Sequence, residues 1–312
     1  MRRFRMLALG ASVLALLVSA CSTGGGGSSP STASSQAAKP KVTIGSANFT
    51  ESALVAEIYA QALEAKGFTV DRKLNLGDRK LTNAALKSGQ INLMPEYLGY
   101  EAAELKATST GDAVATAAAL KTALAALGLT SLNYAPGTDQ NGFAVRKETA
   151  DQFSLKTMSD AAKVAAQLKW GLPPECSTNA GCGKALKDAY GIDITAPGFQ
   201  WVKLAPCSSQ IAVALNTRNV DVGELCTTQS DIARFNFVLL EDDKQTQSTG
   251  NLVPVLRKDL ADQGGAVLAD TLNAVSAKLT TEELGQMSLK TDVQKAKIED
   301  VAKQFLTDSG LL

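Results

Sequence analysis

The side chains best suited to catalysis are missing from this chain, because its 312 residues include no histidine. Histidine is the commonest general base, and it completes the Ser-His and Cys-His pairs and most zinc sites. No other pair of residues has the spacing of a nucleophile and its base. We therefore predict that the protein is not an enzyme, with no catalytic residue, no metal and no cofactor.

Four cysteines in the second half of the chain offer a different chemistry. They are Cys176, Cys182, Cys207 and Cys226. An even number of cysteines in an exported protein predicts two disulfides, for which three pairings are possible. We favour Cys176 with Cys182, which closes a small loop, and Cys207 with Cys226. A site of four thiolates around a metal is the alternative, but the spacing lacks two tight CxxC pairs.

The remaining cysteine, Cys21, follows a segment that predicts export. A basic head at residues 2–5 precedes the apolar run 6–18, which is too short for a stable membrane span. The tetrapeptide ending in Cys21, Val-Ser-Ala-Cys, resembles a bacterial lipobox. We predict that residues 1–20 are a signal peptide and that Cys21 carries lipid, such as palmitate. The alternatives are an ordinary signal peptide with an incidental cysteine, or an uncleaved anchor.

The composition after Cys21 predicts a tethered protein outside the cytoplasm. Residues 21–40 are rich in Gly, Ser, Thr and Ala and contain no aromatic residue, as in a flexible linker. The chain has 31 basic and 31 acidic residues, and loss of the three signal arginines leaves a net charge of −3. Nucleic acid is therefore an unlikely partner. We expect the protein on the outer face of the cell membrane, held there by lipid alone.

From Lys41 onward, hydrophobic patterns of strands and helices alternate. Residues 42–45 predict a buried strand, and Thr50 is expected to cap the helix that follows. A strand at 68–74, a helix at 81–87 and a strand at 91–94 come next. Alternation of this kind predicts an α/β fold with mostly parallel sheets.

A weak internal echo predicts that there are two such sheets. Residues 85–93 recur in type at 214–222, each as a helix end, a polar turn and a buried strand. The chain ends in helical patterns at 266–278, 281–289 and 293–306. We predict one lobe from residues 41–141 and 241–312, a second lobe from 142–240, and a ligand cleft between them. Chance recurrence of helix, turn and strand is the alternative explanation of the echo.

A family resemblance is carried by the segments 44–52, 57–64, 95–99, 139–145, 173–176 and 238–244. In order and spacing, the chain is similar to the osmoprotectant-binding proteins of ABC importers, which are receptors for glycine betaine, choline and carnitine. The resemblance implies a bilobal periplasmic-binding-protein-like fold of type II, a small-molecule solute, an ABC permease as partner, and a monomer.

The resemblance also implies where a quaternary amine would bind. Such a cation donates no hydrogen bond, so aromatic faces hold it by cation–π attraction, and Tyr97 matches a cage tyrosine of the family. Other polar candidates come from loops and strand exits. The predicted ligand-binding residues are Asn48, Thr50, Tyr97, Tyr100, Asn141, Thr227 and Thr228.

Departures from the family pattern leave the ligand open. Ala47, Ser52 and Tyr100 replace donors found in many members, and Asn141 stands where several relatives have a second cage tyrosine. Tyr100 either restores an aromatic face or narrows the cleft against betaine. A different small ligand is therefore one alternative. A surface lipoprotein that acts as a hydrolase or an adhesion module is another.

Five further side chains are candidates for the cleft wall, but we expect another role for each. We expect Arg79 to be a solvated loop residue. The four aromatic residues are expected to be core rather than cage, and they are Phe143, Trp170, Phe199 and Trp201.

Overall fold

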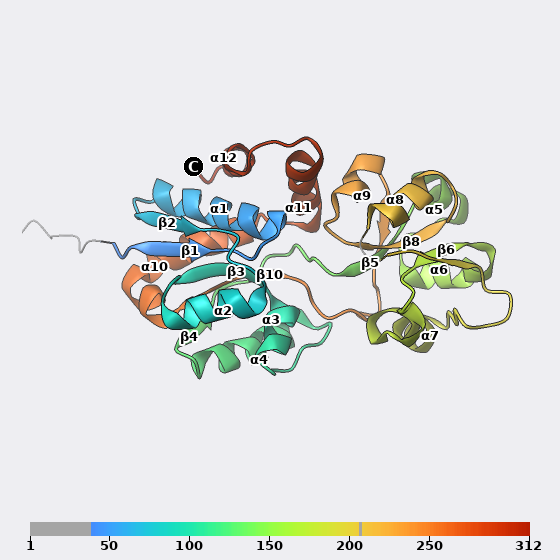
Figure 1. Cartoon of the computed structure of the whole chain (residues 1–312), viewed down its shortest axis with the longest axis horizontal. Coiled ribbons are helices and arrows are strands. Elements are labelled where there is room, and N and C mark those ends of the chain that lie inside the picture. Colours follow the sequence, from blue (N-terminus) through green and yellow to red (C-terminus); the bar gives the residue numbers. More distant parts are fainter. Residues whose placement is uncertain (1–38, 206–207) are drawn as a thin grey trace, which may run out of the picture. The chain divides into compact units, whose positions relative to one another are not determined.

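The computed structural model describes residues 39–205 and 208–312, which form two α/β lobes (Figure 1). The predicted signal peptide, Cys21 with its predicted lipid, most of the predicted linker and Cys207 lie outside the described residues. Within the described part, no helix is both long and apolar enough to cross a membrane.

The first lobe is built on a five-stranded sheet with the order β2-β1-β3-β10-β4. β1 pairs in parallel with β2 and β3, whereas β10 is antiparallel to β3 and β4. Because β1 and β3 run the same way, the segments that follow them meet at one edge of the sheet. The strands are β1 (Val42–Gly45), β2 (Val70–Lys73), β3 (Leu93–Tyr97), β4 (Leu129–Ser131) and β10 (Leu252–Arg257).

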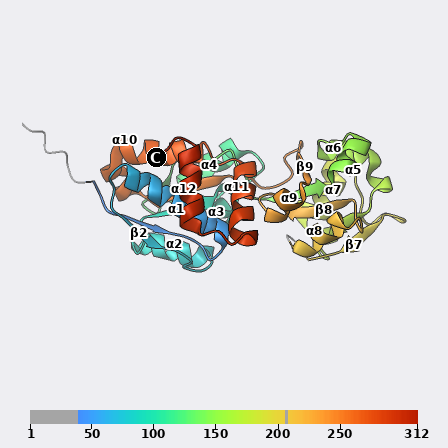
Figure 2. The same ribbon diagram turned by 90° about the horizontal axis from the view of Figure 1, so that it is seen from above.

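Helices cover both faces of this sheet, and the alternating side chains of its strands enter two hydrophobic cores. Leu93 packs into one core and its neighbour Met94 into the other. Figure 2 shows α1 and α12 side by side over one face. That face is covered by α1 (Thr50–Ala65), α10 (Lys258–Ser276), α11 (Thr281–Ser288) and α12 (Ile298–Asp308), and the other by α2 (Arg79–Ser88), α3 (Leu98–Glu104) and α4 (Ala113–Ala125).

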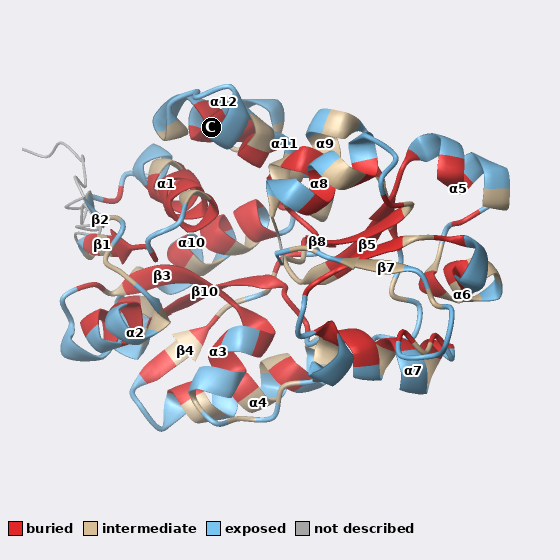
Figure 3. Ribbon diagram, turned by 45° about the vertical axis from the view of Figure 1, so that its right-hand side comes forward, coloured by how far each residue is buried: buried red, intermediate tan, exposed pale blue. Residues whose placement is uncertain are grey.

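The second lobe repeats this plan around a sheet with the order β7-β6-β8-β5-β9. Its inner strands are buried, as the red ribbons of β5 and β8 in Figure 3 show, whereas its edge strands β7 and β9 are largely half-buried. Trp170 of β6 is fully buried. The strands are β5 (Asn141–Val145), β6 (Trp170–Leu172), β7 (Trp201–Lys203), β8 (Val222–Cys226) and β9 (Val238–Leu240). The helices are α5 (Lys147–Phe153), α6 (Met158–Val164), α7 (Ala185–Tyr190), α8 (Ser209–Asn216) and α9 (Ser230–Phe235). Shorter helical turns lie at Ala165–Gln167, Cys176–Thr178, Ala180–Lys184 and Leu289–Val293.

Two segments cross between the sheets, and they pair with each other. Thr138 forms an antiparallel bridge with Asn251, and the Asp139 N–H donates to the Gly250 carbonyl at 2.9 Å. A Cβ at Gly250 would lie only 1.9 Å from the Asp139 carbonyl oxygen. Glycine is therefore required for the two crossovers to approach this closely.

The predicted echo is confirmed as a repeated helix–turn–strand unit. α2 leads into β3 and α8 leads into β8. In each copy an N–H bonds back to a helical carbonyl at 3.2 Å, from Ile91 to Ala85 and from Val220 to Ala214. The two lobes thus share a local plan that positions the ends of β3 and β8.

Several local predictions are wrong at element ends, and the strand predicted at 91–94 forms at Leu93–Tyr97. Thr50 does not cap α1: Phe49 occupies the N-cap position, no side chain accepts there, and Thr50 is already helical. The strand predicted at 68–74 forms only over β2. The last helix begins at Ile298 rather than at 293, because a π-helical turn ends at 293 and Lys295 adopts a positive φ of 58°.

Candidate functional site

Three aromatic rings gather where β1 and β3 end. Phe49 precedes α1, Tyr97 ends β3, and Tyr100 lies in the first turn of α3. The Tyr97 ring centroid is 6.1 Å from that of Phe49 and 6.3 Å from that of Tyr100. Phe49 is 42% exposed and Tyr100 41%, whereas Tyr97 is 3% exposed. This aromatic cluster therefore presents two open rings, with the third buried beside them.

A buried carboxyl, Glu51, lies directly behind the cluster. The Tyr97 hydroxyl donates a hydrogen bond to Glu51 Oε1. Burial and the nearby charge of Asp139 raise the pKa of Glu51 to about 7, although Tyr97 and Thr228 act to lower it. Glu51 lies in the first turn of α1, where the helix N-terminus favours a negative charge.

Asp139 brings a second carboxyl from the crossover between β4 and β5. Burial raises the pKa of Asp139, while the hydroxyl and backbone N–H of Thr228 lower it. Within the described residues, the buried Asp139 Oδ1 has no hydrogen-bond partner. Since Thr228 follows β8, a residue of the second lobe acts on two acids beside the first sheet.

Arg79 supplies a positive charge to the same edge. Its Nε donates to Glu96 Oε2 at 2.9 Å and lies 3.8 Å from Glu101 Oε2. Its guanidinium carbon lies 5.5 Å from the centroid of the Tyr100 ring. The expectation of a solvated loop arginine is wrong, because Arg79 is helical and paired with a buried carboxylate.

The structure divides the predicted ligand residues into two groups. Tyr97, Tyr100 and Thr228 come together around Glu51 and Asp139. Thr50 starts α1 next to Glu51, and Asn48 is exposed, with its N–H donating to the Gly77 carbonyl at 2.9 Å. Roles for these side chains in binding stay predictions.

Thr227 and Asn141 line a separate cavity of about 320 Å³ between the lobes. The Thr227 hydroxyl donates to the Thr138 carbonyl at 2.7 Å and accepts from the Gln140 N–H at 3.1 Å, so it also ties the crossover to β8. None of the rings of the aromatic cluster lines this cavity. Thr227 in its wall is the chain neighbour of Thr228, which acts on Glu51 and Asp139. The cluster has the chemistry to hold a cation, because open rings lie there beside buried acids.

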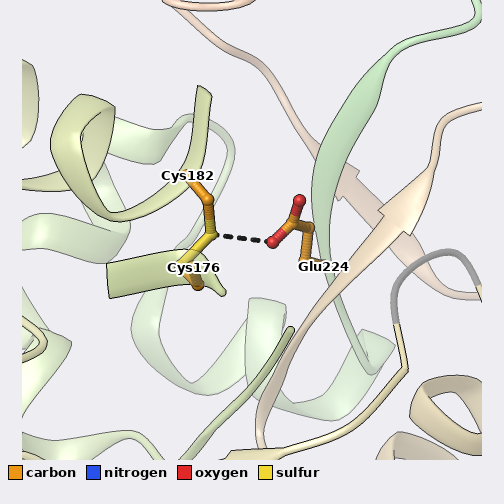
Figure 4. A group of neighbouring side chains, drawn as sticks. All are labelled: Cys176, Cys182 and Glu224. Atoms are coloured by element: carbon orange, nitrogen blue, oxygen red, sulfur yellow. Dashed lines mark hydrogen bonds between the residues drawn. A yellow bond between two sulfur atoms is a disulfide. The ribbon is translucent and has the colours of Figure 1, made fainter. Parts of the chain in front are cut away.

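The cysteines form a different kind of cluster in the second lobe (Figure 4). Cys176 and Cys182 are joined by a disulfide, as predicted, and Glu224 Oε2 lies 2.8 Å from the Cys182 sulfur. Burial and the charge of Glu175 raise the pKa of Glu224 to about 7, so its protonated form can donate to that sulfur. Oxidised sulfurs are not thiolates, and the group therefore has no thiolate with which to bind a metal.

Cys226 is also disulfide-bonded. Its predicted partner Cys207 lies outside the described residues, so that pairing stays a prediction. Among the weighed aromatic residues, Phe143 and Trp170 belong to the core of the second lobe, and Phe199 and Trp201 pack against it as partly buried side chains. The expectation of core positions agrees with this packing.

Sequence reasoning missed three members of the site. Phe49 was not weighed as a wall, and Glu51 and Asp139 were not named as ligand residues. The sequence did show an acid, Glu51, shortly after the first predicted strand, and a second acid, Asp139, in the crossover. Acidic residues are usually solvated, so neither pattern indicated burial.

The family comparison covers nearly all of the described chain. Residues 40–308 match the model described as the substrate-binding domain of the ABC-type glycine betaine transport system. A glycine-betaine-binding protein of Pseudomonas aeruginosa is 26% identical over 283 residues, covering 86% of this chain and 88% of the relative. A carnitine transport binding protein, OpuCC, of Listeria monocytogenes is 28% identical over 303 residues, covering 93% and 91%.

Solved structures confirm the predicted bilobal fold. The crystal structure of a glycine betaine/carnitine/choline ABC transporter matches with a TM-score of 0.79 and 23% identity, covering 87% of this chain and 99% of that one. Apo YehZ from Escherichia coli matches with the same TM-score and coverage at 25% identity.

Proposed function

Because this chain belongs to the family of substrate-binding domains of ABC-type glycine betaine transport systems, we propose that its solute is a quaternary amine held at the aromatic cluster. Members of this family serve transport rather than catalysis. The protein thus binds a small osmoprotectant such as glycine betaine or choline and delivers it to a permease.

The observation that carries this proposal is the placement of open rings beside buried acids. A quaternary ammonium is attracted by the faces of Phe49 and Tyr100 and by Tyr97 behind them, each worth about 0.5 to 2 kcal/mol. Its positive charge also stabilises the ionised form of Glu51, whose pKa burial has raised to about 7. An uncharged solute gains neither of these interactions.

The second lobe completes the site through Thr228, which acts on Glu51 and Asp139. A ligand that touches both lobes favours the arrangement in which they close on it. This proposal includes the division into lobes, with the first lobe formed by residues 41–141 and 241–312 and the second by residues 142–240. The membership of the ten strands in two sheets supports them.

We extend the proposal to the anchor. Cys21 carries lipid after removal of residues 1–20, and a monomeric receptor is thereby held on the outer face of the membrane close to its permease. Cys21→Ala should move the mature protein from the membrane fraction to the soluble fraction. Membrane retention of this variant, with no acyl chain on the wild-type N-terminal peptide, would contradict lipid anchoring.

Calorimetry on the soluble domain tests the ligand site. Tyr100→Ala and Phe49→Ala should each weaken binding of a quaternary amine about two- to thirtyfold, because each removes one cation–π face worth about 0.5 to 2 kcal/mol. Both side chains are about two-fifths exposed, so these variants should fold. Tyr97→Phe should retain much of the affinity, since it keeps the ring.

Two controls give this experiment its meaning. Tyr134→Ala removes a tyrosine of the first lobe that packs elsewhere, against the core of α2, α3 and α4, and it should leave binding unchanged. Sugars and amino acids lacking a quaternary nitrogen should give no heat. Unchanged affinity in both cluster variants would rule out the aromatic cluster, and silence toward every solute would favour an adhesion lipoprotein.

A further inference from the structure

Arg79 has hydrogen-bonding capacity that its ion pair does not use. Asp78 caps α2 by accepting from the Leu81 N–H, which sets Arg79 as the first residue of the helix. Only Nε of Arg79 donates within the described residues, to Glu96. A guanidinium has five N–H groups, so the four on Nη1 and Nη2 are left over. The side chain is 28% exposed, so part of it is open to solvent.

Arg79 and Asp139 carry opposite charges, and both affect the pKa of Tyr100. The pKa of Tyr100 is raised by burial and by the charge of Asp139, whereas Arg79 lowers it. Tyr100 therefore lies within electrostatic range of one cation and one anion. Because the guanidinium already lies over the Tyr100 ring, a ligand placed on this cluster meets a positive group on one side.

Other donors for an anionic group are few at this edge. Ala47 has no polar side chain, and its N–H donates to the Ser52 hydroxyl at 3.0 Å. Arg79 is the cationic side chain in contact with the cluster among the residues that the structure describes. A guanidinium fork matches the geometry of a carboxylate better than any neutral donor.

We propose that Arg79 binds the carboxylate of a zwitterionic ligand, with the ligand's ammonium directed toward Asp139 and Glu51. This assignment rests on the proposed function and adds a residue that sets specificity. A ligand with both charges satisfies Arg79 and the acids together. A quaternary amine without a carboxylate is attracted only by the two acids, and Arg79 repels its positive charge.

Glycine betaine and choline form a matched pair of probes, because they share the trimethylammonium group and differ in having a carboxylate or a hydroxymethyl group. By calorimetry, Arg79→Gln should weaken glycine betaine binding about ten- to a hundredfold, since it removes a charge-assisted hydrogen bond. Choline affinity should stay the same or rise. Lys80→Gln, at an exposed neighbour, should change neither.

The ratio of the two affinities separates recognition from folding. Loss of the ion pair with Glu96 would disturb both ligands alike, so a shift in the ratio is not produced by a structural role. Arg79→Lys keeps the positive charge near Glu96 but loses the fork. It should weaken glycine betaine several-fold without weakening choline, and it serves as the test if Arg79→Gln does not fold.

The possible failures are distinguishable. Equal changes for both ligands, or no change for either, would overturn the role of Arg79 while the quaternary-amine site stands. Wild-type protein that binds choline but not glycine betaine would also overturn it. Wild-type protein that binds neither probe would remove the proposed ligand class and, with it, the assignment of Arg79.

Discussion

The ends of β3 and β8 share a local plan but differ in how each buries a glutamate. Glu96 in β3 is 3% exposed and accepts from Arg79 Nε at 2.9 Å. Glu224 in β8 is 2% exposed and has the Cys182 disulfide sulfur at 2.8 Å. Burial raises the pKa of both, but only Glu96 has a cation that acts to lower it.

This difference shows that the same helix–turn–strand unit can hold a buried glutamate in two ways, either paired with a cation or without one. A buried carboxylate requires a partner, or else it remains protonated at higher pH. At β3 the partner is the Arg79 guanidinium, which also lies over the exposed ring of Tyr100. A positive charge is therefore present beside the surface at which we propose that the ligand binds. At β8 the carboxyl packs against sulfur, so it contributes a neutral group to the lobe at low pH.

Among the substitutions that test this comparison, Arg79→Gln should change the unfolding free energy most. It leaves Glu96 and Glu101 buried without a cation, and we expect a loss of about 3 kcal/mol in unfolding free energy at pH 8. Arg79 now lowers the pKa of both carboxyls, so without it each pKa rises further. The loss should therefore shrink as the pH falls, because protonation removes the buried negative charges.

Urea unfolding at pH 5 and at pH 8 measures this dependence. Lys80→Gln controls for the loss of a charge on the same helix and should be nearly neutral. An equal loss for Arg79→Gln at both pH values would assign the effect to packing, and the electrostatic contrast between the strands would fail.

Glu224→Gln should change the unfolding free energy at pH 8 in the opposite direction, as a gain in stability. The pKa of Glu224 in the folded state is about 7, above its ordinary value of 4.5. Its contribution is therefore favourable below pH 4.5 and is lost as the pH rises through 7. At about 1.4 kcal/mol per pKa unit, the wild type loses about 2 to 3 kcal/mol between pH 5 and pH 8.

Because glutamine cannot ionise, Glu224→Gln should be more stable than wild type by about that amount at pH 8, and the gain should fall below about 1 kcal/mol at pH 5. Glu283→Gln, an exposed glutamate of α11, is the matched control and should show no such trend. A destabilised Glu224→Gln at pH 8 would mean that the ionised carboxylate has a favourable partner.

Much of the architecture followed from periodicity. The buried strand at 42–45 and the repeated unit ending in β3 and β8 formed as predicted, because apolar spacing determines which face of an element is buried. Element ends were predicted less well. Thr50 is an ordinary capping residue type, but capping depends on backbone angles that only the adjoining strand and loop decide.

The site was only partly predictable for a related reason. The family resemblance pointed to Tyr97 and Tyr100, and the structure places their rings together. Arg79, Glu51 and Asp139 were misjudged or missed, because a charged residue in sequence looks the same whether it is solvated or paired. Burial of a charge depends on neighbours far along the chain, such as Thr228 for Glu51.

By itself, the sequence determined the absence of histidine chemistry and the α/β alternation, because composition and local spacing are sufficient for both. It favoured two lobes and the Cys176–Cys182 disulfide without deciding either, because the echo could arise by chance and four cysteines allow three pairings. Only the tertiary structure placed a guanidinium on Tyr100, two acids beside Tyr97 and a disulfide against Glu224. Those contacts join distant segments, and their energies arise from burial and low dielectric, which exist only after the chain has folded.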